Sequence, residues 1–164
     1  MISSSSRSIF VYGTLMAPEV MQTLVSRLPP NRPATLAGYS RHPVAGYAFP
    51  GIVVSEKVNG SAAYQTSVSG LLFTDLTHNE LTILDWFEDS EYTRTQVSVT
   101  ITARDNDQKQ SSVTTQAYVW TNPLSELRVN QAWDYERFRR DHLPDYLVRV
   151  VEPCRIEFER ETKK

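Results

Sequence analysis

The sequence predicts an α+β fold in which a mixed or barrel-like β-sheet packs against two or three helices. Short runs rich in β-branched and aromatic residues recur along the 164-residue chain, which is typical of short strands. A few segments between these runs have helical spacing and helix-start signals. Strands and helices do not alternate regularly, which argues against a parallel βαβ sheet, and the length fits a single domain over residues 1–164.

The N-terminal part of the chain is predicted to form short strands around one helix. Ile9–Tyr12 is a β-branched and aromatic run that ends at Gly13, as a strand closing in a turn does. Pro18 suits the first position of a helix, and apolar residues follow at helical spacing until Pro29. Residues 34–55 are strand-like but interrupted by Pro and Gly, which predicts short strands joined by tight turns.

The middle of the chain contains the clearest helix signal. Val68–Thr74 is a strand candidate, and Thr77–Phe87 follows it with helical spacing. Thr77 and Glu80 have the spacing of a capping box, in which each residue's side chain bonds the other's backbone N–H group. We therefore expect a helix to begin directly after Thr77.

The C-terminal part is predicted to contain two long strands and a further helix. Thr93–Thr102 and Val113–Trp120 alternate between apolar and polar residues, and the polar segment 104–112 between them is expected to be a hairpin loop. Trp133–His142 is the third helix candidate. The tail from Ile156 onward is charged, and we expect it to fray.

Composition excludes several classes of function. The 17 Lys and Arg against 19 Asp and Glu give a net charge of −2, which argues against nucleic-acid binding through a globally basic surface. No run approaches the roughly 18 apolar residues of a membrane span. Cys154 is the only cysteine, and the three histidines lack ligand spacing, so no metal is expected. Met1–Ser8 lacks the apolar core of a secretion signal, which indicates a cytoplasmic protein.

The first candidate site is the turn between the first strand and the first helix. Backbone N–H groups in such a turn, together with the positive end of the helix, favour binding of a carboxylate. Alternatively, Gly13 only lets the chain turn. The turn lacks the further glycines and the lysine of nucleotide-binding loops, so no nucleotide cofactor is predicted. The candidate binding residues are Tyr12, Gly13, Thr14, Leu15, Met16 and Ala17.

The second candidate site is the carboxyl group of Glu88. On a helical wheel of about 100° per residue, Glu88 lies between Leu81 and Leu84, inside the apolar arc. Asp85 lies on the margin of this arc and Asp89 outside it. A carboxylate that faces the core is costly unless it is paired, hydrogen-bonded or lines a cavity. Burial would also raise its pKa and make it a better proton acceptor at neutral pH.

Other interpretations of these residues remain open. If the helix ends near Phe87, the wheel no longer applies, and Glu88 is a solvated loop residue or a partner of Arg94. Tyr92 and Tyr118 could reach into the mouth of a barrel and touch a ligand. The alternative for both tyrosines is amphipathic packing in the core.

Three blocks of sequence occur in a fixed order: Phe10–Leu15 (FVYGTL), Phe49–Val53 (FPGIV) and Leu84–Arg94 (LDWFEDSEYTR). Each block alone is a weak signal, but the ordered set resembles the γ-glutamylcyclotransferase-like superfamily, and within it the plant avirulence-induced AIG2-like proteins. The resemblance implies a small closed barrel with a core over about residues 9–151. The Ser-rich N-terminal segment and the charged C-terminal tail would then be flexible.

Similar enzymes convert a γ-glutamyl amide into 5-oxoproline and a free amine. The resemblance implies that Tyr12–Ala17 binds the substrate and that Glu88 is the catalytic base, the same residue that the helical wheel selects. The substrate's own α-amine is the nucleophile, so no cofactor is expected, and the partner is a small γ-glutamyl amine or peptide rather than nucleic acid or membrane. The leaving amine stays open between an amino acid, a glutathione-type peptide and a lysine conjugate. A non-catalytic module that binds a carboxylate or a peptide end, and a hydrolase, remain alternatives.

Overall fold

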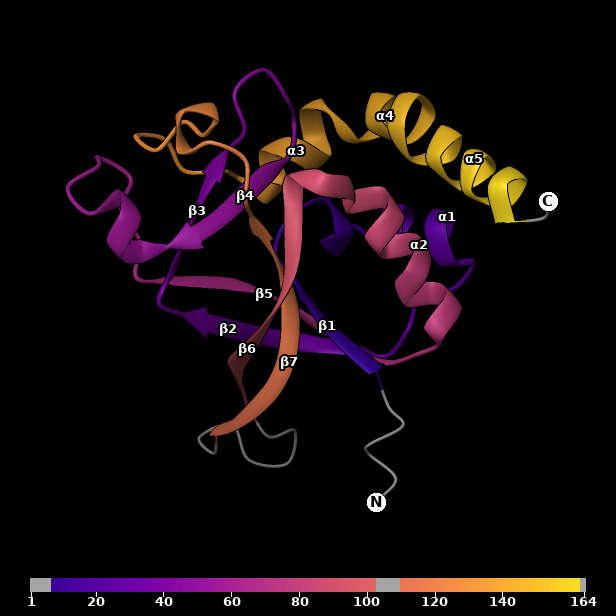
Figure 1. The fold of residues 1–164 in the computed structure, drawn as a ribbon, viewed down its shortest axis with the longest axis horizontal. Coiled ribbons are helices and arrows are strands. Elements are labelled where there is room, and N and C mark those ends of the chain that lie inside the picture. The colour runs from indigo at the N-terminus through magenta and orange to yellow at the C-terminus, as the bar shows by residue number, and fades with distance from the viewer. Residues whose placement is uncertain (1–6, 103–109, 163–164) are drawn as a thin grey trace.

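The computed structural model describes residues 7–102 and 110–162. Its strands close into a barrel in the order β1-β5-β2-β6-β7, in which β1 pairs in parallel with β7 and every other neighbouring pair is antiparallel (Figure 1). The predicted mixed barrel is therefore confirmed. The barrel strands are β1 (Arg7–Val11), β2 (Asn31–Ala37), β5 (Ser67–Leu76), β6 (Tyr92–Thr102) and β7 (Gln110–Trp120).

A separate hairpin lies beside the barrel. Strands β3 (Tyr39–Pro43) and β4 (Pro50–Val54) pair antiparallel, in agreement with the short strands predicted for this region. The fully buried His42 connects β3 to the segment around Gln131. Its Nε2 lies 2.8 Å from Ser40 Oγ on the same strand, and its Nδ1 lies 2.8 Å from the Gln131 carbonyl oxygen. Burial lowers the pKa of this histidine.

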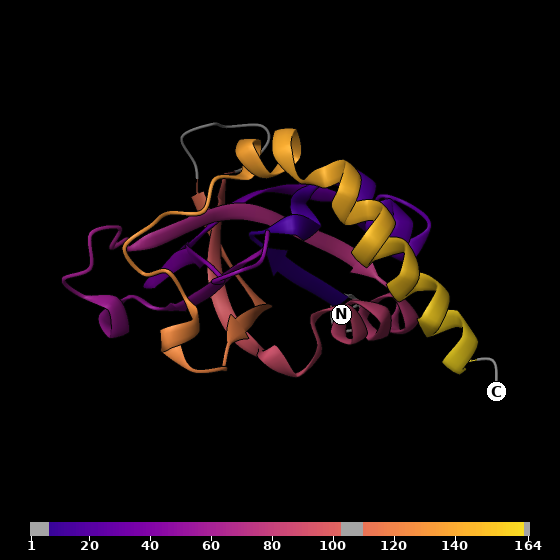
Figure 2. The same cartoon turned by 90° about the horizontal axis from the view of Figure 1, so that it is seen from above.

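Helices cover one side of the barrel. Figures 1 and 2 show α1, α2 and α5 packed together there, with α5 crossing the other two. Helix α4 continues through a π-helical turn at Leu147–Val151 into α5, so the described part of the chain contains more helix than predicted. The helices are α1 (Pro18–Val25), α2 (His78–Glu88), α3 (Tyr135–Asp141), α4 (Leu143–Tyr146) and α5 (Glu152–Thr162).

The expectation that the chain frays from Ile156 is wrong. Helix α5 extends to Thr162 and buries Phe158, whose ring packs edge-on against Trp86 of α2 at a centroid distance of 5.8 Å. Arg155 Nη1 also donates to Ser26 Oγ at 2.9 Å, beyond the end of α1. The charged composition concealed one apolar face, and docking of that face on α1 and α2 orders the helix.

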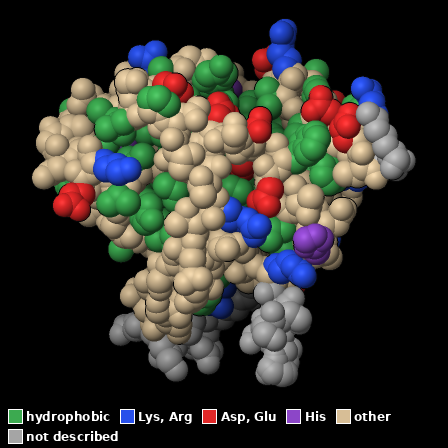
Figure 3. All heavy atoms as spheres, viewed as in Figure 1, with side chains coloured by type: hydrophobic (Ala, Val, Ile, Leu, Met, Phe, Trp, Pro, Cys, Tyr) green, Lys and Arg blue, Asp and Glu red, His purple; other side chains and the backbone are tan. Residues whose placement is uncertain are grey.

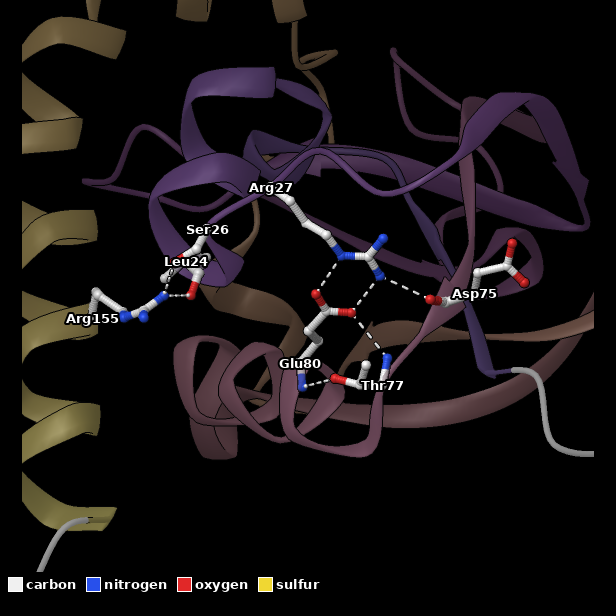
Figure 4. A network of polar contacts seen from close by, with 7 residues as sticks. All are labelled: Leu24, Ser26, Arg27, Asp75, Thr77, Glu80 and Arg155. Carbon is white, nitrogen blue, oxygen red and sulfur yellow. Dashed lines mark hydrogen bonds and ion pairs between the residues drawn. The ribbon is translucent and has the colours of Figure 1, made fainter.

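A polar network links the segment that follows α1 to the first turn of α2 (Figure 4). The guanidinium of Arg27 donates twice to the Glu80 carboxylate, at 2.6 and 2.7 Å, and once to the Asp75 carbonyl oxygen at 2.8 Å. The capping box of Thr77 and Glu80 is present as predicted. Helix α2 therefore begins after Thr77, and its first turn is tied to the segment that follows α1.

Apolar side chains fill both the barrel interior and the space between the barrel and the helices. The interior holds Phe10 and Leu72, and the helix-facing layer holds Leu24, Leu84 and Phe138, all at most 2% exposed. No helix of the described residues is both long and apolar enough to cross a membrane. The predicted hairpin loop falls at residues 104–112, of which 104–109 lie outside the described residues and 110–112 belong to β7.

Candidate active site

The turn after β1 has unused hydrogen-bond donors. Residues Thr14–Met16 form a short 3₁₀ helix, and the N–H groups of Met16 and Ala17 donate to the carbonyl oxygens of Gly13 and Thr14, at 3.0 and 3.1 Å. Within the described part of the chain, the N–H groups of Gly13, Thr14 and Leu15 have no backbone acceptor. Three consecutive N–H groups are therefore available to a ligand that carries an oxyanion.

Gly13 is required by a close approach and not by a left-handed backbone conformation. Its φ is −129°, so the residue does not lie in the left-handed region. A Cβ atom at this position would lie 2.8 Å from Cγ and 2.9 Å from Cδ of Pro50. These distances are shorter than van der Waals contact, so the turn lies directly against the start of β4.

Glu88 is the last residue of α2, so the helix reaches it and the predicted wheel applies. Its side chain is half-buried and has no hydrogen-bond or ion-pair partner among the described residues. Burial, together with the negative charges of Glu91 and Asp85, raises the pKa of Glu88 from its usual 4.5 to about 8. Arg94 Nε lies 3.1 Å from Asp85 Oδ1, so the alternative in which Arg94 pairs with Glu88 is wrong.

A cavity of about 600 Å³ brings most of the candidate residues together. Its lining includes Tyr12, Gly13, Thr14 and Leu15 from the turn, Glu88 from α2, and Tyr92 and Tyr118 from the barrel. Met16 and Ala17 do not line it: Ala17 is fully buried in the core as the N-cap residue of α1, and Met16 packs against the same core. The proposed binding segment is thereby shortened to Tyr12–Leu15.

Three tyrosine hydroxyls of the cavity wall donate hydrogen bonds to the protein. Tyr12 Oη donates to the Tyr118 carbonyl oxygen at 2.6 Å, and Tyr92 Oη donates to the Pro50 carbonyl oxygen at 2.7 Å. Tyr118 Oη donates to Asp85 Oδ1 at 2.7 Å. Burial raises the pKa of all three phenols. These tyrosines both pack in the wall and line the cavity.

Sequence reasoning missed the wall that the C-terminal helices provide. Tyr146, Val150, Cys154 and Glu157 line the cavity, and Tyr146 Oη lies 3.3 Å from Thr14 Oγ1. These four residues recur every three or four positions, which is the spacing of one helix face. This spacing could have been used to predict that they lie together on one side of a helix. Burial raises the pKa of the Cys154 thiol to about 11, so this cysteine is not a reactive thiolate.

The charged residues of the cavity wall are all acidic. Glu88, Asp89, Glu91 and Glu157 line it, and its described lining contains no Lys, Arg or His. In the view of Figure 3, acidic side chains lie among hydrophobic ones in the upper half of the molecule, whereas the surface over β7 is mostly backbone and side chains that are neither hydrophobic nor charged. No group of three or more His, Cys, Asp or Glu side chains within the described ranges is arranged to hold a metal ion.

The closed barrel with a cavity between a glycine turn and an acidic helix end defines a class of small barrel proteins. A solved structure titled gamma-glutamyl cyclotransferase shares the fold, with a TM-score of 0.53 and 16% identity over 71% of this chain and 68% of that one. A solution structure of an Arabidopsis thaliana protein has a TM-score of 0.60 and 26% identity, covering 88% of this chain and 87% of the other.

Sequence comparison then identifies the family. The family described as gamma-glutamyl cyclotransferase, AIG2-like matches residues 9–139. AIG2-like protein D of Arabidopsis thaliana is 34% identical over 88% of this chain and 87% of its own length, and AIG2-like protein B of the same plant is 32% identical over 92% and 79%. The chain belongs to the gamma-glutamyl cyclotransferase, AIG2-like family.

Proposed function

We propose that the protein is a γ-glutamyl cyclotransferase that converts a γ-glutamyl amine into 5-oxoproline and a free amine. The observation that carries the proposal is the presence, in one cavity, of the unpaired Glu88 carboxyl group and the free N–H groups of Gly13–Leu15. A cavity that only binds an anion gains nothing from a half-buried carboxylate, because like charges repel. A reduced, cytoplasmic setting, as expected from the single cysteine, is part of the proposal.

The proposed reaction is an intramolecular acyl transfer. The substrate's α-nitrogen attacks its own γ-carbonyl carbon, the new C–N bond closes a five-membered ring, and the bond from that carbon to the leaving nitrogen breaks. The α-nitrogen is bound as an ammonium and loses two protons, and the leaving nitrogen gains two. Neither water nor a cofactor is consumed. Glu88 carries each proton in turn from one nitrogen to the other.

The environment of Glu88 suits this proton transfer. An ordinary carboxylate is too weak a base to deprotonate an α-ammonium group, whose usual pKa is about 8. The pKa of Glu88 is raised to about 8 as well. A proton can therefore pass between two groups of similar affinity at little cost in free energy.

The turn supplies the complementary interaction. The N–H groups of Gly13, Thr14 and Leu15 can hold the substrate's α-carboxylate or the oxyanion that develops on the γ-carbonyl oxygen. A donor directed at a developing oxyanion typically contributes about 3 kcal/mol to transition-state stabilisation.

The experiment is incubation with a panel of γ-glutamyl amides, scored for 5-oxoproline and for glutamate. We expect 5-oxoproline from the parent protein and a roughly 10²- to 10⁴-fold lower turnover for Glu88→Gln. Glu80→Gln makes the same chemical change at the far end of α2, outside the cavity, and should retain parental turnover. Glutamate as the product would identify a hydrolase, and binding without product would identify a non-catalytic module.

A further inference from the structure

Tyr118 is hydrogen-bonded at both of its ends, and its partners belong to the two halves of the candidate site. Its carbonyl oxygen accepts from Tyr12 Oη at 2.6 Å, and its own hydroxyl donates to Asp85 Oδ1 at 2.7 Å. Tyr12 begins the binding turn, and Asp85 lies on α2 one helical turn before Glu88. Tyr118 is only 4% exposed. One buried residue thus spans from the turn to the helix that carries the proposed base.

The Asp85 carboxylate is fixed by a second donor. Arg94 Nε lies 3.1 Å from the same Oδ1 atom, and Arg94 Nη1 donates to Gln116 Oε1 at 2.6 Å. Arg94 and Tyr118 are directly opposite each other on β6 and β7, so their side chains leave the same face of the strand pair. An ion-paired carboxylate only accepts hydrogen bonds, so the Tyr118 hydroxyl must be the donor.

We propose that Tyr118 and Asp85 are positioning residues that set the geometry between Glu88 and the Tyr12–Leu15 turn. The inference rests on the proposed cyclotransferase function, because it concerns how the base meets the bound α-amine. A small displacement of a catalytic group from its reacting atom costs a large factor in rate. The first turn of α2 is held separately, by the pairing of Glu80 with Arg27 (Figure 4), so loss of the Tyr118–Asp85 bond would loosen only the end that carries Glu88.

The bond and the charge of Asp85 have separable effects. Tyr118→Phe removes the bond and leaves the Asp85 charge in place. Asp85→Asn keeps the shape of the side chain and removes the negative charge, which is one of the causes of the raised pKa of Glu88. A residue that only stabilises the fold would not change the pH dependence of the reaction.

The test is 5-oxoproline formation over a range of pH by the parent, Tyr118→Phe, Asp85→Asn, the double variant and Glu80→Gln, with a melting temperature for each. We expect Tyr118→Phe to lower kcat by roughly 10- to 100-fold without moving the acid limb of kcat/KM. Asp85→Asn should lower kcat and move that limb to lower pH. The double variant should combine the kcat loss of Tyr118→Phe with the acid-limb shift of Asp85→Asn, because one change removes the hydrogen bond and the other removes the charge.

Three outcomes would overturn the inference: parental kcat for Tyr118→Phe, an unmoved acid limb in Asp85→Asn, or an equal loss of kcat in Glu80→Gln at a similar fall in melting temperature. If the parent is active, Glu88→Gln is inactive and Tyr118→Phe behaves as the parent, only this inference fails. If the parent forms no 5-oxoproline from any γ-glutamyl amide, the proposed function fails and the inference fails with it.

Discussion

Replacement of Glu88 by Gln should stabilise the protein at alkaline pH and have little effect on stability at acidic pH. The folded protein holds the Glu88 proton up to a pH of about 8, whereas the unfolded chain releases it near the usual pKa of 4.5. Between these values the folded state binds more protons than the unfolded state, so the free energy of unfolding falls as the pH rises. Glutamine does not titrate, and the variant lacks this loss.

The pKa difference sets the upper limit of the effect. A shift from 4.5 to about 8 corresponds to roughly 5 kcal/mol at 1.36 kcal/mol per unit. The Glu88 side chain is only half-buried and the cavity admits water, which reduces the cost of the charge. We therefore expect about 1–3 kcal/mol of stabilisation by Glu88→Gln above a pH of about 8. Urea denaturation of parent and variant at about pH 5 and about pH 8.5 measures it.

Glu80→Gln is the matched control, because its expected effect has the opposite sign. The hydrogen bonds from Arg27 lower the pKa of Glu80, so its contribution to stability is present above its unfolded pKa and is lost as the pH falls through the folded value. This variant should be destabilised at neutral and alkaline pH and less so in acid. A difference between Glu88→Gln and the parent that does not change with pH would show that Glu88 is an ordinary solvated carboxylate, and the reasoning would be refuted.

Two further predictions concern the shape and the charge of the cavity. Gly13→Ala should destabilise the fold by about 1–3 kcal/mol, because its Cβ would overlap Pro50, and Pro50→Ala in the same chain should recover part of that loss in urea denaturation. γ-Glutamyl amines whose leaving group carries a positive charge should have a kcat/KM a few-fold higher than those whose leaving group carries a carboxylate, because every charged residue of the described lining is acidic. Equal kcat/KM values, or an unchanged ratio in Glu157→Gln, would contradict this.

Local signals in the sequence were sufficient for most of the elements. The capping box at Thr77 and Glu80 placed the start of α2 correctly, and the alternation in β6 and β7 identified both strands. The end of α1 was less predictable. Pro29 indicated where the helix could no longer continue, but α1 ends at Val25 because Ser26 adopts a left-handed conformation with a φ of 69°.

Features that depend on distant contacts could not be predicted in the same way. The charge of the segment from Ile156 onward suggested a frayed tail, because local composition does not reveal that Phe158 packs on Trp86. Helix periodicity alone predicted that Glu88 lies inside the apolar arc of the helix and Asp85 on its margin. This is possible because the face on which a helical residue lies depends only on its position along that helix. The partner of Asp85 was not predictable, because Tyr118 lies 33 positions away and reaches it only when the barrel closes.

The three sequence blocks that carry the family resemblance meet at Pro50. Gly13 of the first block lies so close to the Pro50 ring that no larger residue fits without displacement. Tyr92 of the third block donates its hydroxyl to the Pro50 carbonyl oxygen, and Pro50 itself belongs to the second. Each block alone is a weak signal of the family, because it contains only one of the residues that meet at this contact. Together they place the free N–H groups of the turn and the end of α2 beside one cavity, so a change at Pro50 would affect its contacts with both of the other blocks.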